Sequence, residues 1–311
     1  MSAFKVFAMS LVRQINPLKI RDVRHEQWKL TFREYLFRTV CRHRQGRRPN
    51  ILLFCSRRGG STWLLNTLAS HPGMRYTGRP FMVSIFSRYR DRVPDLARAA
   101  GYEGDYRFEH VIHFEGDDLD RFERFARRLL HGQVEVYPTL HFGADYFHRK
   151  TDRIAFQITN ATPMIEWFDD RLDIQPLLLF RHPIPTALSI MDKGWRQECY
   201  DFIYNRWFMD TRLNESQRAL ARAIVEGDSL LHKHVLDWTL KMLVPYRAMA
   251  SGRHPDWPAV FYEQAVLRPE AVVEYLGGEL DLPDTAAMLE QIRRPYKTFT
   301  ASSADKVSDL G

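Results

Sequence analysis

Residues 51–65 read Ile-Leu-Leu-Phe-Cys-Ser-Arg-Arg-Gly-Gly-Ser-Thr-Trp-Leu-Leu, and the rest of the sequence is organised around them. Residues 51–54 are apolar and predict a short buried strand. Trp63 and the leucines after it predict a helix that runs towards His71 and Pro72. A strand, a glycine-rich turn and a helix form the geometry of a phosphate cradle. The glycines let the backbone approach an anion, and the first helix amides lack intrahelical partners.

The residues between this strand and helix carry the groups expected to hold the anion. Backbone amides, two hydroxyls and the fixed charge of Arg58 are the donors. The loop is not a Walker A motif, because no Gly-Lys-Ser/Thr follows Gly60. An ordinary tight turn with solvated arginines is the alternative interpretation. The residues predicted to bind the anion are Arg57, Arg58, Gly59, Gly60, Ser61 and Thr62.

A second stretch, residues 177–189, repeats the arrangement of an apolar strand that ends at a cation: Leu-Leu-Leu-Phe-Arg-His-Pro-Ile-Pro-Thr-Ala-Leu-Ser. Pro183 suits the first turn of a helix. Arg181 at the strand end and Ser189 on the helix are expected to grip a second phosphate. A strand-end ion pair and a serine bonded to its own helix backbone are the alternatives. Two such sites at two strand ends favour one shared ligand.

With both motifs in this order, the sequence resembles the sulfotransferases that use 3′-phosphoadenosine 5′-phosphosulfate (PAPS). Residues 56–64 resemble their 5′-phosphosulfate loop, and residues 180–189 resemble their 3′-phosphate motif. Residues 259–263 and 267–270 resemble a late strand and the segment after it, although Gln264 departs from the common pattern. The resemblance implies PAPS as the sulfuryl donor and a hydroxyl or amine as the acceptor.

The order of the expected elements is strand, loop and helix, then an irregular stretch, then further strands alternating with helices. This alternation predicts an α/β fold with a mainly parallel central sheet flanked by helices, the P-loop-like architecture of sulfotransferases. Ligands of such sheets bind beyond the carboxyl ends of the strands, where both motifs lie.

The resemblance also implies roles for single residues at the nucleotide. Arg58 would neutralise charge on the oxygen that the sulfuryl group leaves, and Trp63 would stack on adenine or else pack in the core. A late basic segment closes the nucleotide site in many relatives. The further residues placed at the nucleotide in this way are Tyr262, Arg293, Arg294 and Lys297.

The catalytic base cannot be carried over from the relatives. Arg79 stands where many of them have a glutamate, and Gln157 stands at or near the position of a common lysine. Histidine suits proton abstraction at neutral pH. His141, in an aromatic-rich stretch, is the predicted base, and a surface histidine or an unidentified carboxylate are the alternatives. No metal is expected, because the three cysteines form no metal-binding pattern.

The basic character belongs to the first 49 residues, which carry 12 lysines and arginines against 3 acidic residues. The remainder carries 33 against 35 and is nearly neutral. Residues 1–49 predict a basic amphipathic arm that contacts a membrane peripherally, or a helix pair that packs on the domain. The predicted domain spans residues 50–300, with an acceptor-binding insert at about 82–152 and a flexible tail at 301–311.

The arm is too short and charged to span a bilayer and has no secretory cleavage site. The three widely spaced cysteines fit a reducing, cytoplasmic location best. The acceptor is expected to carry a hydroxyl group, and the basic arm favours a glycan or a lipid-linked glycan. Nucleic acid is not expected as a partner. The alternative functions are a non-catalytic, membrane-associated protein that binds PAPS or another anion, and a nucleotide kinase. The missing loop lysine counts against the kinase.

Overall fold

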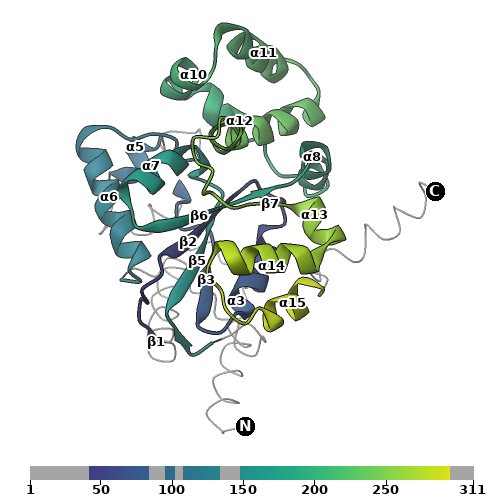
Figure 1. Cartoon of the computed structure of the whole chain (residues 1–311). Coiled ribbons are helices and arrows are strands. Elements are labelled where there is room, and N and C mark those ends of the chain that lie inside the picture. The colour runs from purple at the N-terminus through teal and green to yellow at the C-terminus, as the bar shows by residue number, and fades with distance from the viewer. Residues whose placement is uncertain (1–41, 84–94, 102–107, 134–147, 295–311) are drawn as a thin grey trace, which may run out of the picture.

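The computed structural model describes residues 42–83, 95–101, 108–133 and 148–294. A five-stranded sheet lies at its centre, with the order β3-β5-β2-β6-β7 and parallel pairing throughout (Figure 1). The predicted fold class, a mainly parallel sheet flanked by helices, is therefore confirmed. The strands of this sheet are β2 (Asn50–Cys55), β3 (Met74–Thr77), β5 (Arg153–Ile158), β6 (Ile174–Phe180) and β7 (Ala259–Phe261).

The central strands are apolar on both faces, which is typical of a parallel sheet covered by helices on each side. Along β2, Leu52 and Phe54 point into one core, whereas Ile51, Leu53 and Cys55 point into the other. All five of these side chains are fully buried. The run of apolar residues that predicted a buried strand thus serves two hydrophobic cores at once.

Each core is closed by its own helices (Figure 1). The first core lies under α6 (Gly116–Leu130) and α7 (Ile165–Arg171) and part of α12 (Leu230–Ala250). The second core lies under α3 (Ser61–Ser70) and the three C-terminal helices α13 (Tyr262–Leu267), α14 (Pro269–Glu279) and α15 (Ala286–Ile292). Shorter elements complete this part: α5 (Leu96–Ala99), η1 (Thr162–Met164) and α8 (Pro183–Met191).

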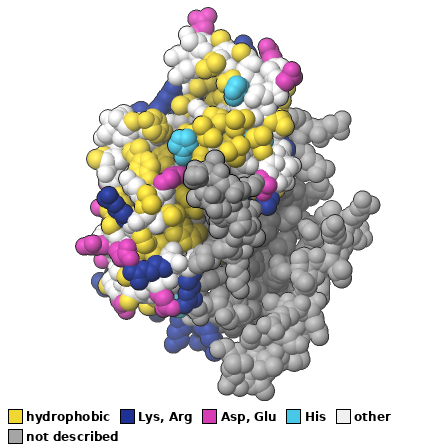
Figure 2. Space-filling model, turned by 90° about the vertical axis from the view of Figure 1, so that its right-hand side faces the viewer, with side chains coloured by type: hydrophobic (Ala, Val, Ile, Leu, Met, Phe, Trp, Pro, Cys, Tyr) yellow, Lys and Arg dark blue, Asp and Glu magenta, His cyan; other side chains and the backbone are white. Residues whose placement is uncertain are grey.

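A third hydrophobic cluster forms a helical lobe at the top of Figure 1, built from α9 (Cys199–Ile203), α10 (Arg206–Arg212), α11 (Glu215–Glu226) and α12. Figure 2 shows hydrophobic side chains gathered on the upper part of one face of the molecule. A cavity of about 230 Å³ lies between α11 and α12. The Tyr246 side chain of α12 is 53% exposed. No helix of the described residues is long and apolar enough to cross a bilayer.

The last part of the predicted N-terminal arm packs on the domain. Arg42 and His43 form β1, which pairs with β4 (Lys150–Thr151) as a separate two-stranded sheet. Arg48 donates a hydrogen bond to the backbone carbonyl of Asp281. Residues 1–41 of the arm and the predicted tail at 301–311 lie outside the described residues.

The strand order creates a crevice at the carboxyl end of β2. After β2 the chain forms β3 and β5 on one side of it, and then β6 and β7 on the other. The connections that leave β2 and its neighbours therefore diverge at this point, which is where open parallel sheets bind their ligands.

Candidate functional site

The loop after β2 presents uncapped helix amides. Gly60 is the N-cap residue of α3 and has a φ angle of +90°, in the left-handed region that glycine adopts without strain. No side chain accepts a hydrogen bond from the first turn of α3. These amides are free to bind an anion, as the sequence predicted for a phosphate cradle.

Side chains from neighbouring strands hold this loop in place. The side-chain amide of Gln157, at the end of β5, donates to Ser61 Oγ at 2.6 Å. The ring of Tyr262 lies so close to Gly60 that a Cβ atom there would come within 2.4 Å of it. The loop is therefore fixed from both sides before any ligand binds.

We predict that Gly60→Ala disrupts this loop. The added methyl group would meet the Tyr262 ring, and alanine is strained at this φ angle, so a loss of about 1–3 kcal/mol in the free energy of unfolding is expected. Chemical denaturation measures the loss. Gly252→Ala is the matched control, because Gly252 has a φ angle of +66° with no atom near its missing Cβ. Equal losses in the two variants would show that Tyr262 exerts no constraint.

The two sequence motifs meet at the loop. The Arg58 side chain donates through Nε to Ser189 Oγ at 2.9 Å. The Arg181 side chain donates through Nη1 to the carbonyl oxygen of Arg58 at 2.7 Å, and its guanidinium lies 4.6 Å from the centre of the Tyr262 ring. Burial lowers the pKa of Arg181. Residues predicted for two different phosphates thus form one contiguous surface.

A cavity of about 440 Å³ opens in front of the loop and Tyr262. Arg181 and Ser189 are not among its lining residues, although both contact Arg58, which is. The described lining contains five arginines and no aspartate or glutamate. Such a charge distribution suits a ligand with several negative charges. The lining residues are Arg57, Arg58, Gly60, Ser61, Thr62, Trp63, Arg79, Gln157, Thr159, Trp195, Tyr262, Ala265, Val266, Pro269, Ile292, Arg293 and Arg294.

The remaining predicted nucleotide residues are placed as follows. Trp63 lines the cavity, donates through Nε1 to the carbonyl of Ile292 at 3.0 Å, and meets Tyr262 edge to face. Arg293 and Arg294 line the cavity at its outer end, where Arg293 also pairs with an exposed glutamate, Glu270. Gly59 lies in the loop itself, its amide 3.3 Å from the carbonyl of Ser56. The predicted base His141 and the basic residue Lys297 lie outside the described residues.

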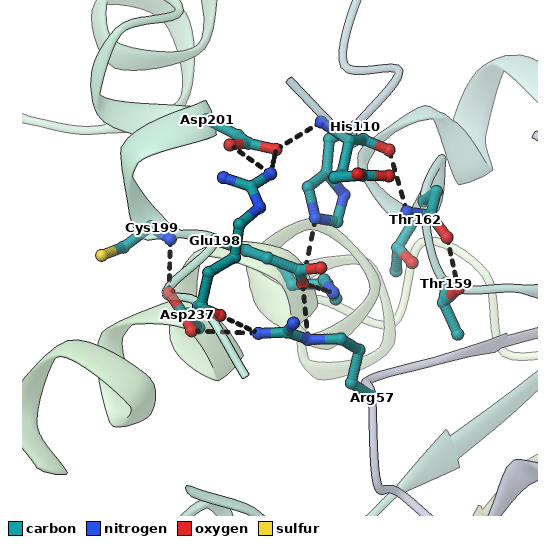
Figure 3. A network of polar contacts seen from close by, with 12 residues as sticks. Arg57, His110, Thr159, Thr162, Glu198, Cys199, Asp201 and Asp237 are labelled. Carbon is teal, nitrogen blue, oxygen red and sulfur yellow. Dashed lines mark hydrogen bonds and ion pairs between the residues drawn. The ribbon is translucent and has the colours of Figure 1, made fainter. Parts of the chain in front are cut away.

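Arg57 turns away from the loop amides into a buried charge cluster (Figure 3). Its Nε atom lies 2.9 Å from Glu198 Oε2. Lys241 Nζ and His110 Nε2 lie 2.5 Å and 3.1 Å from the same oxygen. The four side chains are at most 11% exposed. We call this set the Glu198 cluster.

The cations of the Glu198 cluster stabilise the charged form of its carboxylate. Burial alone would raise the pKa of Glu198, but Lys241, His110 and Arg57 together hold it well below its ordinary value. Burial lowers the pKa of Lys241, and the Glu198 carboxylate opposes this effect. Glu198 is therefore ionised at neutral pH and serves as the shared counter-ion of the cluster.

Arg57 also ties the loop to the segment after α8. Its Nη2 atom donates to the carbonyl of Arg196 at 2.9 Å and lies 3.5 Å from Asp237 Oδ2. Trp195, on the same segment, lines the cavity beside Arg57 and Arg58, whose guanidinium carbons lie 5.7 Å and 5.9 Å from its ring centre. Arg57 thus positions one wall of the cavity as well as the loop.

The sequence did not indicate Glu198, Asp237 or Lys241 as part of the site. A signal was present for Lys241, which stands between Leu240 and Met242 on a helix face predicted to be core. A charged residue on such a face requires a buried counter-ion. The counter-ion itself, Glu198, could not be identified from the sequence, because it lies on a distant segment. Among the described residues, no group of three or more histidine, cysteine, aspartate or glutamate side chains is arranged to hold a metal ion.

Comparison with known proteins found no matching family model and no matching curated protein. Solved structures with a similar chain path were found, each at 14% sequence identity. The sulfotransferase domain of the curacin biosynthetic pathway has a TM-score of 0.43, with 80% of each chain covered. The sulfotransferase domain of the Synechococcus PCC 7002 olefin synthase has a TM-score of 0.41, with 85% of this chain and 84% of that chain covered.

A sulfotransferase from Alicyclobacillus acidocaldarius has a TM-score of 0.36, with 81% of this chain and 99% of that chain covered. These three solved structures are of sulfotransferases or sulfotransferase domains.

Proposed function

We propose that the chain is a sulfotransferase that uses PAPS as the donor and a hydroxyl group as the acceptor. The observation that carries this proposal is the meeting of the two motifs, through the contacts from Arg58 to Ser189 and from Arg181 to the Arg58 carbonyl. A ligand with two separated phosphates fits this surface. The arginine-rich cavity without a described carboxylate supports a ligand of high negative charge.

The residues divide the work between binding and charge stabilisation. The uncapped amides of α3 and the Thr62 hydroxyl bind the 5′-phosphate, and Arg181 with Ser189 binds the 3′-phosphate. PAPS supplies the sulfuryl group that is transferred. Arg58 offsets the negative charge that collects on the departing phosphate oxygen, as cations do in phosphoryl transfer.

The transfer itself requires one bond to form and one to break. The acceptor oxygen forms a bond to sulfur, and the bond from sulfur to the 5′-phosphate oxygen breaks, leaving its electron pair on that phosphate. The acceptor proton passes to a base, for which His141 is our candidate. The products are the sulfated acceptor and 3′-phosphoadenosine 5′-phosphate (PAP).

Nucleotide binding tests the donor site first. We predict that PAP binds the wild type more tightly than adenosine 5′-phosphate, and that Arg181→Ala removes this difference, weakening PAP roughly 10- to 100-fold. Isothermal titration calorimetry measures both ligands. Adenosine 5′-phosphate is the internal control for damage to the loop, because it lacks the 3′-phosphate. Equal affinity for the two nucleotides in the wild type would contradict the proposal.

A non-catalytic anion-binding protein would share this binding site and differ in turnover. Release of PAP from PAPS in the presence of hydroxyl acceptors distinguishes the two functions. Tight, Arg181-dependent binding of PAP with no release above the rate of spontaneous PAPS hydrolysis would favour the binding protein.

A further inference from the structure

Arg79 occupies a strained position in the wall of the cavity. It follows β3 and has a φ angle of +46°, in the left-handed region, and it precedes Pro80, which disfavours helical backbone conformations in the residue before it. Arg58 is strained in the same way, with a φ angle of +57°. Both arginines line the cavity. Such strain persists where the surrounding structure imposes it, and it is concentrated at functional sites.

The charge of Arg79 has no counter-ion among the described residues. The described lining of the cavity holds no carboxylate, and no described aspartate or glutamate forms an ion pair with Arg79. Its positive charge acts on the thiol of Cys55 at the end of β2, although burial dominates there and raises the pKa of Cys55 to about 11. The guanidinium therefore exerts its field at the start of the phosphate loop.

Arg79 lies on the opposite side of β2 from the predicted 3′-phosphate contacts. Arg181 and Ser189 follow β6, on one side of β2, whereas Arg79 follows β3, on the other side beyond β5. Two strand spacings separate the ends of β3 and β2 by about 10 Å, a gap that an extended arginine side chain largely bridges.

The end of β5 fills the space between Arg79 and the loop. The backbone of Gly78 lies against the Gln157 side chain, which in turn donates to Ser61. Thr159 lines the cavity beside them, and its hydroxyl donates to Asn160 Oδ1 at 2.6 Å. Polar side chains and one unbalanced cation thus line this side of the cavity.

We propose that Arg79, with the side-chain amide of Gln157, forms an oxyanion subsite separate from the contacts for the two nucleotide phosphates. The proposal deepens the proposed function and rests on it. The oxyanion has two possible sources: the sulfuryl group of the donor, or an acidic group of the acceptor. In either case the subsite places a fixed positive charge beside the sulfuryl group or the acceptor, and not beside the nucleotide phosphates.

Titration of sulfate into the PAP complex of the full chain tests the subsite, because PAP fills the phosphate contacts and leaves the subsite open. Sulfate is expected to bind the wild type. Arg79→Gly should weaken sulfate binding roughly tenfold or more, because one charge-assisted hydrogen bond is lost. Arg79→Lys should retain part of the affinity. Glycine relieves the strain at this φ angle, so the melting temperature of Arg79→Gly should not fall below that of the wild type.

Asp284→Gly is the matched control, since Asp284 has a φ angle of +58° and does not line the cavity. It should leave sulfate binding unchanged. Absence of sulfate binding to the wild-type PAP complex, or equal binding by Arg79→Gly, would overturn the subsite. If PAP itself fails to bind, the proposed function is wrong, and the same sulfate titration on the free chain still tests Arg79.

The affinities for PAPS and PAP identify the source of the oxyanion. Weakened binding of PAPS by Arg79→Gly, with PAP unchanged, assigns the subsite to the sulfuryl group. Unchanged binding of both nucleotides, together with the loss of sulfate, assigns it to an acidic group of the acceptor. Equal weakening of PAPS and PAP would place Arg79 at a nucleotide phosphate and contradict the proposal.

Discussion

Glu198→Gln is expected to lower the free energy of unfolding by about 3–5 kcal/mol, because it leaves Arg57 and Lys241 buried without their shared counter-ion. Urea denaturation at neutral pH measures the loss from the midpoint and slope. Glu290→Gln, which breaks an exposed pair with Arg294 on one helix turn, is the control and should cost less than about 0.5 kcal/mol.

A second substitution separates unpaired charge from lost packing. Adding Lys241→Met to Glu198→Gln removes one of the unbalanced cations and should restore most of the stability. If the double variant is as unstable as Glu198→Gln alone, the charge balance of the Glu198 cluster is not what stabilises it.

The effect of Glu198→Gln on stability should also depend on pH. The folded chain holds the pKa of Glu198 well below the ordinary value of 4.5, so its stabilising effect is fully present above pH 4.5. The effect is lost as the pH falls through the lower folded-state pKa. The difference in stability between the wild type and Glu198→Gln should therefore shrink on acidification below 4.5.

Arg58→Ala is expected to reduce the rate of sulfuryl transfer by roughly 100- to 1,000-fold, the cost of removing one preorganised donor that acts on developing charge. Release of PAP from PAPS measures the rate, with water as the acceptor where no better acceptor is found. Arg58 has a φ angle of +57°, which is unfavourable for arginine and alanine alike, so the substitution adds no new backbone strain.

The control for Arg58→Ala is Arg206→Ala, since the Arg206 side chain is 94% exposed and, within the described residues, pairs with Asp210 on its own helix. It should leave the rate unchanged. A fall in PAP affinity as large as the fall in rate would show that Arg58 acts in ground-state binding and not selectively in the transition state.

The part of the fold that is encoded locally could be predicted from the sequence. The run from Ile51 to Leu65 contains its own strand, turn glycines and helix start, and the structure places β2, the loop and α3 there. Pro183 likewise fixes the start of α8. Neither prediction needs information from a distant segment, because the backbone preferences and the apolar pattern lie within the stretch itself.

The strand β3 could not be predicted in the same way. Its sequence, Met-Arg-Tyr-Thr, is short and half polar, and it is the edge strand of the sheet next to β5. The role of Arg57 is a second example. Its place in the loop could be read, and Arg57 does line the cavity. Its contacts with Glu198 and Asp237 could not be predicted, because no local pattern connects those residues to the loop. Tertiary contacts decide both cases.

The contact between Arg57 and Asp237 also has a consequence for the order in which the site is completed during synthesis. It joins residues 180 positions apart, so the phosphate loop leaves the ribosome long before its anchoring partners exist. Closing such a distant contact is entropically costly and slow. The nascent chain can form β2 and α3 early, yet the loop acquires its final shape only after α12 has docked. A chain that ends before α12 would therefore lack the anchor of this loop.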